Sequence, residues 1–259
     1  MTDASSTGAM RAHVPGSPPR ARDVAPPNGG FAVVEMFTSQ GCSSCPPAEE
    51  LLTEIERDAR MRGQPVFALG FHVDYWDDLG WPDRFADASY TARQEAYAQA
   101  FGSGRLYTPQ MVVNGTVEFV GSDRRRAATA IASGLTSAAT TPLRLSVQDY
   151  GAGTGAGQRV VLGYETARPP QRAVLNVAIV ERGLQSEVLR GENAGRTLRQ
   201  DNVVRAFTSS GLDVERGQVE LEVPPDLDPR QATVVGYVQN DGDKAIVAAA
   251  AVDLSAVAG

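Results

Sequence analysis

A pair of cysteines between a strand-like run and a helix-like run constrains this chain more than any other feature. Residues 31–52 read FAVVEMFTSQGCSSCPPAEELL, in which a nearly continuous apolar run meets a Gly-Cys-Ser-Ser-Cys-Pro-Pro turn and then a helical pattern. Cys42 and Cys45 are the only two cysteines of the sequence. Because the first turn of a helix offers free N–H groups and the positive end of the dipole, this placement favours a thiolate at the first sulfur. The stretch therefore predicts dithiol or disulfide chemistry.

Length and charge exclude several classes of protein. A chain of 259 residues is long enough for one large or two medium domains that need no disulfide staples. The net charge of −7 argues against a nucleic-acid partner. No apolar segment approaches the roughly 20 residues that span a bilayer, so we expect a soluble protein with no membrane span.

The first 30 residues differ in composition from the rest. They are rich in proline and small polar residues and carry Arg11, Arg20 and Arg22, without the apolar segment that an export signal requires. We expect residues 1–30 to form a disordered leader and the protein to be cytoplasmic. A start that is truncated relative to the native one would instead allow export to the periplasm or the outside of the cell.

Residues 31–140 alternate between strand and helix patterns. The apolar runs 31–37 and 65–73 are typical of buried strands, and the short helical crossover between them predicts a right-handed parallel pair whose C-terminal ends lie side by side. A helix, an X-Pro step and a hairpin with an Asn-Gly turn come next, followed by a last helix. The expected ranges after the second strand are 83–101, 108–109, 110–120 and 123–137.

Beyond Pro142 the pattern changes to short strand-like runs separated by Gly, Pro and Asp-Gly turns. This rhythm is typical of an antiparallel sandwich, so we expect a second domain at residues 141–259. The segment 186–205 (SEVLRGENAGRTLRQDNVVR) is predicted as a long polar connection that is either functional or caps an open edge. The strand-like runs are 143–149, 159–166, 173–182, 218–223, 232–239 and 244–252.

The element order of residues 31–138 resembles that of the thioredoxin superfamily, in which a Cys-x-x-Cys follows the first core strand and a cis-proline precedes the third. A closer resemblance is to an uncharacterised bacterial family, catalogued as domain of unknown function 1223. The stretches that carry it are VVEMFTSQGCSSCPPAEELL, FHVDYWDDLGWPD, RQEAYA, YTPQMVVNG and GENAGRTLRQDNVVR. The resemblance implies an α/β thioredoxin-like N-terminal domain followed by an all-β, sandwich-like C-terminal domain.

The two cysteines have distinct predicted roles. The Cys42 thiolate attacks a disulfide sulfur, and Cys45, one helical turn on, resolves the mixed disulfide, so no cofactor is needed beyond this redox-active pair. Residues 31–56 contain five glutamates and no Lys or Arg. Only the dipole and the N–H groups are then available to stabilise the thiolate, which predicts a thiol pKa of about 7 to 8.

Glu35 lies inside the first apolar strand, seven residues before Cys42. A buried carboxylate with a raised pKa could take the proton of Cys45 during resolution, as a buried acid on this strand does in thioredoxins. The alternative is a glutamate bonded to a backbone or side-chain donor. Both remain open at this point.

His72 and Asp74 fall at the end of the second predicted strand and hence beside the cysteines. His72 is a candidate third metal ligand or proton donor, against the alternative of a hydrogen-bonded histidine in a packed turn. Two cysteines and one histidine fall short of the four ligands of a structural zinc site, so no metal site is predicted.

Thr108-Pro109 matches the position of the cis-proline, and we expect its peptide bond to be cis. The backbone before such a proline is free to pair with an extended peptide, which makes Thr108, Pro109 and the preceding Tyr107 candidate substrate-binding residues. Trp76 joins them if one face of its ring is exposed. Packing of the inserted loop is the alternative for Trp76 and Trp81.

Three function classes follow from these features. The first is a thiol–disulfide oxidoreductase acting on a protein disulfide or dithiol. The second is a module that binds or transfers a soft metal, Cu or Zn, through Cys42 and Cys45. The third is a scaffold whose disulfide is inert.

Overall fold

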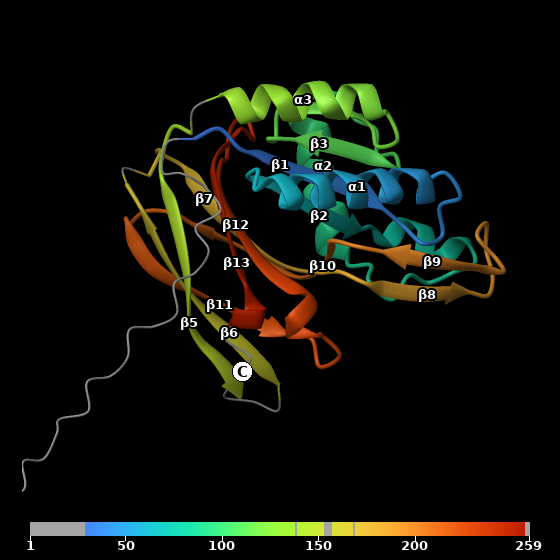
Figure 1. Ribbon diagram of the computed structural model, residues 1–259. Helices are drawn as coiled ribbons and strands as arrows, with labels where there is room; N and C mark the ends of the chain where they lie inside the picture. The colour runs from blue at the N-terminus through green and yellow to red at the C-terminus, as the bar shows by residue number, and fades with distance from the viewer. Residues whose placement is uncertain (1–28, 138, 153–156, 168, 257–259) are drawn as a thin grey trace, which may run out of the picture.

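The computed structural model describes residues 29–137, 139–152, 157–167 and 169–256 (Figure 1). The predicted disordered leader therefore lies almost entirely outside the described residues. None of the helices in the described ranges combines the length and the hydropathy needed to cross a bilayer.

The first half of the chain contains its elements in the order predicted from the sequence. Pro46 and Pro47 occupy the first turn of α1, and Gly63 ends this helix with a φ of 62°. The side chains of Asp87 and Asp123 cap α2 and α3. The elements are β1 (Ala32–Thr38), α1 (Pro46–Arg62), β2 (Val66–His72), the short helix η1 (Asp74–Leu79), α2 (Ala88–Ala100), β3 (Gln110–Val113), β4 (Val117–Val120) and α3 (Arg124–Thr136).

The second half consists of strands joined by short turns, and every predicted strand-like run is found as a strand. The prediction of a long loop at residues 186–205 was wrong, because most of this segment forms a hairpin, β8 and β9, and the start of β10. The elements are β5 (Leu143–Ala152), β6 (Gln158–Thr166), β7 (Ala173–Glu181), β8 (Leu184–Val188), β9 (Arg196–Gln200), β10 (Val203–Gly211), β11 (Arg216–Val223), η2 (Pro229–Gln231), β12 (Ala232–Asn240), β13 (Ile246–Asp253) and η3 (Leu254–Ala256).

One mixed sheet of eight strands runs through both halves of the chain, in the order β13-β12-β7-β10-β2-β1-β3-β4. β1 and β2 are parallel, with Thr38 opposite His72 at their C-terminal ends. The two halves join where β10 pairs with β2 in parallel, at Val203 and Gly70. The Gly70 N–H donates to the Asn202 carbonyl over 2.7 Å, and a side chain at Gly70 would meet that carbonyl at 3.3 Å.

This continuous sheet corrects the fold class expected from the sequence. A thioredoxin-like α/β domain followed by a separate β-sandwich was the wrong prediction, because β7, β10, β12 and β13 extend the sheet of β1 to β4. Among the described residues, two smaller sheets are separate from it: the three-stranded sheet β11-β6-β5 and the two-stranded hairpin of β8 and β9. The protein is mostly β, with few helices on a large mixed sheet.

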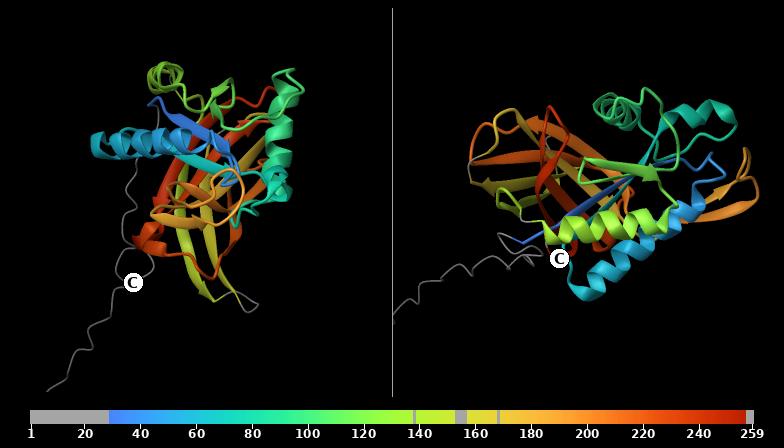
Figure 2. Two further views of the ribbon diagram at one scale, coloured as in Figure 1. Left: turned by 90° about the vertical axis from the view of Figure 1, so that its right-hand side faces the viewer. Right: turned by 90° about the horizontal axis from the view of Figure 1, so that it is seen from above.

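The layers on the two faces of the sheet are different. α1 and α3 pack on one face through a core that includes Val34 and Met36, while α2 packs on the opposite face, toward Val33 and Phe37 (Figure 2, left). These pairs alternate along β1, as side chains do in a strand. At the other end of the large sheet, the three-stranded sheet encloses a third core with β7, β12 and β13.

Candidate functional site

Cys42 and Cys45 form a disulfide at the point where β1 meets α1, with their Cα atoms 5.4 Å apart. Cys45 is the N-cap residue of α1, and its carbonyl accepts the amides of Ala48 and Glu49. The Cys42 sulfur lies 3.3 Å from the Ser44 hydroxyl, which can donate to a thiolate there. Both cysteines have a relative exposure of 0%, although Ser43 and Ser44 between them are exposed.

The hairpin of β8 and β9, residues 184–200, covers the cysteine turn. It projects beside α1 at the edge of the molecule (Figure 1). The buried side-chain amide of Asn193, in its connecting loop, donates to the carbonyls of Gln40 and Cys42, both at 2.9 Å. The neighbouring Glu192 carboxylate accepts the Ser43 amide at 3.0 Å, and hydrogen bonds from Ser43 lower its pKa. We call residues 184–200 the clamp hairpin.

Gln40 connects both strands of the clamp hairpin to the cysteine turn. Its side-chain amide donates to the Ser186 hydroxyl of β8 and to the Gln200 carbonyl oxygen of β9, each at 2.9 Å. The side-chain oxygen of Gln40, Oε1, accepts the indole N–H of Trp81 at 3.0 Å. Since Gln40, Ser186 and Gln200 are all buried, these hydrogen bonds are shielded from competing water.

A buried ion pair lies next to Gln40. His72 Nδ1 is 2.6 Å from an Asp83 carboxylate oxygen. The same oxygen also accepts a hydrogen bond from the backbone N–H of Gln40 at 2.8 Å. Burial alone would lower the pKa of His72, but the carboxylates of Asp83 and Glu49 outweigh it and raise this pKa. Burial likewise opposes ionisation of Asp83, yet His72 and the backbone amides hold its pKa below the usual value. A charged His72–Asp83 pair therefore anchors the turn that precedes the cysteines.

Glu49 is a second buried carboxyl group at this site, one helical turn beyond Cys45. Its carboxylate accepts the Thr38 hydroxyl at 2.7 Å and approaches the Gln200 amide at 3.5 Å. Burial is the main cause of its raised pKa. Glu49 is not predicted as a site residue from the sequence, because a glutamate in the first turn of a helix is typical of an interaction with the helix dipole. Its spacing of four residues from Cys45 is the signal that could have indicated it.

The Thr108–Pro109 peptide bond is cis, as predicted. A Cβ built on Gly121 would lie 3.1 Å from both Ala48 and Pro109, so Pro109 lies close to the first turn of α1. The Trp76 indole N–H donates to the Thr108 hydroxyl at 2.9 Å, and the Trp76 Cβ lies 3.3 Å from where a Cβ of Gly41 would be. Three predicted substrate-binding residues, Trp76, Thr108 and Pro109, thus lie near the cysteine turn, and Trp76 is half-buried.

Tyr107, the fourth, points elsewhere. Its hydroxyl donates to Glu118 on β4, and its carbonyl accepts the side-chain amide of Gln94 at 2.8 Å. Tyr107 adjoins the cis peptide through its backbone, while its hydroxyl is held by β4.

Glu35 lies on the face of the sheet that is turned away from α1. Its carboxylate accepts hydrogen bonds from Arg93 Nε at 2.8 Å, from the Tyr237 hydroxyl at 2.7 Å and from the Tyr97 hydroxyl. These contacts agree with the second interpretation of the sequence, in which Glu35 is hydrogen-bonded to side-chain donors. A proton-transfer role for Glu35 stays a prediction.

Comparison with known proteins identifies the family. The model of a family described as "Protein of unknown function (DUF1223)" matches residues 33–239. The chain belongs to the DUF1223 family. A crystal structure of a protein from Agrobacterium tumefaciens is 30% identical, with a TM-score of 0.60, over 85% of this chain and 93% of that one. A search of curated proteins gave no match.

The DUF1223 match confirms the narrower of the two resemblances seen in the sequence. It spans β1 to β12, and so includes the cysteine turn, the clamp hairpin and the strands that join the two halves of the sheet. The covered cysteine turn therefore lies within the region that defines the family.

His72 was also a candidate metal ligand in this DUF1223 protein. Within the described ranges, no group of three or more His, Cys, Asp and Glu side chains is placed to hold a metal ion. The Nδ1 atom of His72 is bonded to Asp83.

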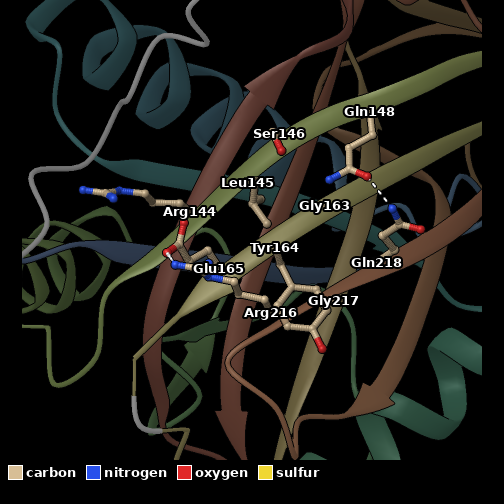
Figure 3. A pocket seen from close by; sticks show the side chains of 10 residues that line it. All are labelled: Arg144, Leu145, Ser146, Gln148, Gly163, Tyr164, Glu165, Arg216, Gly217 and Gln218. Carbon is tan, nitrogen blue, oxygen red and sulfur yellow. Dashed lines mark hydrogen bonds and ion pairs between the residues drawn. The ribbon is translucent and has the colours of Figure 1, made fainter.

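Two surface grooves flank the clamp hairpin. One, of about 440 Å³, lies between α1 and β9 and is lined by Pro46 and Glu49. The other, of about 430 Å³, lies between residues 81–84 and β8. A larger groove of about 810 Å³ is formed by side chains of β5, β6 and β11 (Figure 3). No residue of the cysteine turn or the clamp hairpin lines it, so chemistry and not groove size selects the candidate site.

Proposed function

We propose that this protein is a thiol–disulfide oxidoreductase that acts on a protein disulfide or dithiol through Cys42 and Cys45. The observation that carries the proposal is the Cys42–Cys45 disulfide at the N-terminus of α1. Helix N–H groups and the positive end of the dipole stabilise a thiolate at this position, which makes Cys42 both a nucleophile and a good leaving group. The Ser44 hydroxyl adds a donor where the sequence provides no Lys or Arg.

The reaction requires the clamp hairpin to move. Thiol–disulfide exchange proceeds by in-line attack on a sulfur, and both sulfurs belong to residues with 0% exposure. The ties to be broken are the hydrogen bonds of Asn193 and Glu192 to the cysteine turn. Opening of the hairpin exposes Cys42 beside Thr108 and Pro109, where an extended peptide can bind.

A structural disulfide is the second candidate, and the full burial of both cysteines favours it. In that case the Cys42–Cys45 bond would only fix the turn on which the clamp hairpin rests. Such bonds resist reduction, whereas catalytic ones exchange readily with solution thiols.

A trapping experiment separates the two candidates. The Cys45→Ser variant leaves Cys42 unable to resolve a mixed disulfide, so incubation with extract from the source cells should accumulate covalent adducts that dithiothreitol releases. Insulin reduction by the wild-type protein should depend on both cysteines, with a Cys42→Ser, Cys45→Ser double variant as control. An absence of adducts and turnover, with a disulfide that persists in mild reductant, would establish the structural candidate.

A further inference from the structure

Glu49 is placed to serve the chemistry of Cys45. Glu49 is four residues beyond Cys45, the N-cap residue of α1, whose backbone is itself in the helical region, and the Glu49 amide donates to the Cys45 carbonyl at 3.1 Å. Side chains at this spacing share one helix face, with Cβ atoms about 5–6 Å apart. Both residues are buried, at 0% exposure for Cys45 and 7% for Glu49.

The surroundings of Glu49 support a change of protonation without exposing it. The Thr38 hydroxyl donates to its carboxylate, and His72 and Asp83 act on it electrostatically. Burial raises its pKa, which brings proton uptake closer to neutral pH. Four more charged groups line the adjoining groove: Glu50, Glu54, Arg199 and Asp201.

Glu49 also borders a groove at the surface of the molecule. Glu49 forms part of the wall of the groove of about 440 Å³ between α1 and β9. Glu49 therefore adjoins both the residue that bears the second sulfur and a groove at the surface. In its inferred role, we expect the Glu49 carboxyl group to exchange its proton with water through this groove.

We infer that Glu49 is the proton-transfer residue for Cys45, an assignment that rests on the proposed dithiol chemistry. In substrate reduction, the Cys42 thiolate attacks one substrate sulfur, the substrate S–S bond breaks, and the other sulfur leaves as a thiolate that is protonated by solvent. Glu49 then accepts the Cys45 proton, and the Cys45 thiolate attacks the Cys42 sulfur. The bond from Cys42 to the substrate breaks, and the second substrate thiolate takes a proton from Glu49 or water.

This sequence transfers two electrons from the protein dithiol to the substrate disulfide and leaves the Cys42–Cys45 disulfide. Substrate oxidation follows the same steps in reverse. Glu35, by contrast, is bonded to Arg93 and two tyrosine hydroxyls on the other face of the sheet.

The test uses reduced protein and 4,4′-dithiodipyridine, a small uncharged disulfide that releases one thiopyridone on attack by Cys42 and a second on resolution by Cys45. The Glu49→Gln variant should slow the second release by about 100-fold, the loss typical of a missing general base, and leave the first unchanged. Glu49→Asp should restore part of the rate and the pH dependence. Glu95→Gln, which alters an exposed glutamate of α2 away from this groove, is the control. An unchanged second phase in Glu49→Gln overturns the inference.

A measurement independent of turnover keeps this test separate from that of the proposed function. The carboxyl ¹³C resonance of Glu49 should titrate at a different pH in the oxidised and the reduced protein, because a thiol or thiolate replaces the disulfide beside it. The same titration in both states overturns the inference, even if adducts of Cys45→Ser show the enzyme to be active. A clear difference supports it, even if no protein substrate is trapped.

Discussion

The side-chain amide of Asn193 donates to the Cys42 carbonyl over 2.9 Å and so ties together two residues that are 151 positions apart in the chain. This contact joins the loop of the clamp hairpin to the first cysteine of the motif. We therefore expect a reductant to reach the disulfide when the clamp hairpin moves away.

Asn193→Ala should make the disulfide easier to reduce. The variant leaves the carbonyls of Gln40 and Cys42 without their donor in the closed form, and each lost hydrogen bond is worth about 0.5–1.5 kcal/mol. We expect the rate of reduction by dithiothreitol to rise about 10-fold, measured by alkylation and intact mass. Arg190→Ala, at an exposed position of the same hairpin, is the control. Equal rates in the variant and the wild type would show that the hairpin does not limit access.

Acid should also loosen the clamp hairpin. Hydrogen bonds from Ser43 lower the pKa of Glu192. The stabilisation by the Glu192–Ser43 hydrogen bond is therefore fully present above 4.5, the ordinary pKa of a glutamate, and is lost as the pH falls through the lower pKa of the folded state. Reduction by a phosphine, which remains active in acid, should accelerate in that range. In the Glu192→Gln variant, the disulfide should be reduced at all pH values at the rate that the wild type reaches only in acid. A variant with the same pH dependence as the wild type would refute this role.

The His72–Asp83 pair should stabilise the fold most on the acid side of neutrality. Because the pKa of His72 is raised, its contribution is complete below the ordinary value of 6.5 and is lost as the pH rises through the folded-state pKa. The contribution of Asp83 is present above its ordinary value of 3.8. His72→Gln should therefore lose about 3 kcal/mol in urea unfolding at about pH 6 and less at about pH 9. A deficit that does not change with pH would contradict the charged pair.

Glu35→Gln should reduce stability and leave resolution by Cys45 intact. The substitution leaves Arg93, whose side chain is only 12% exposed, without its carboxylate, a change that costs about 3–5 kcal/mol. Urea unfolding measures the loss, and Glu54→Gln, which breaks an exposed pair with Arg124, should change stability by no more than about 1 kcal/mol. Slow resolution in a variant of unchanged stability would restore the proton-transfer role predicted for Glu35.

Local signals explain what could be predicted from the sequence. Apolar runs, Gly and Pro punctuation and the Asn114-Gly115 turn located the strands and helices, because each depends on neighbouring residues. The pairing that merges the two halves depends on a single register pair, Val203 with Gly70, which no local pattern encodes. The sequence pattern therefore predicts two separate domains, whereas the structure has one continuous sheet through both halves.

The clamp hairpin was missed for a different reason. Its inward residues in β8 and β9 are Ser186, Val188, Leu198 and Gln200, so half of the buried positions are polar. Polar residues hide the apolar–polar alternation that marks a strand, and the two buried polar residues, Ser186 and Gln200, are both bonded by Gln40. The contacts of this segment are with residues distant in sequence, Gln40 and Cys42, so they become visible only in the fold.

The separation of Asn193 from Cys42 also has a consequence for the chain during its synthesis. At about 5–20 residues per second, the two cysteines are made roughly 8–30 seconds before the loop that covers them. During that interval we expect both thiols to be open to oxidants and exchange partners, without the cover that residues 184–200 later provide. The disulfide should therefore be able to form before the clamp hairpin does, which mass analysis of arrested nascent chains with and without residues 184–200 can test.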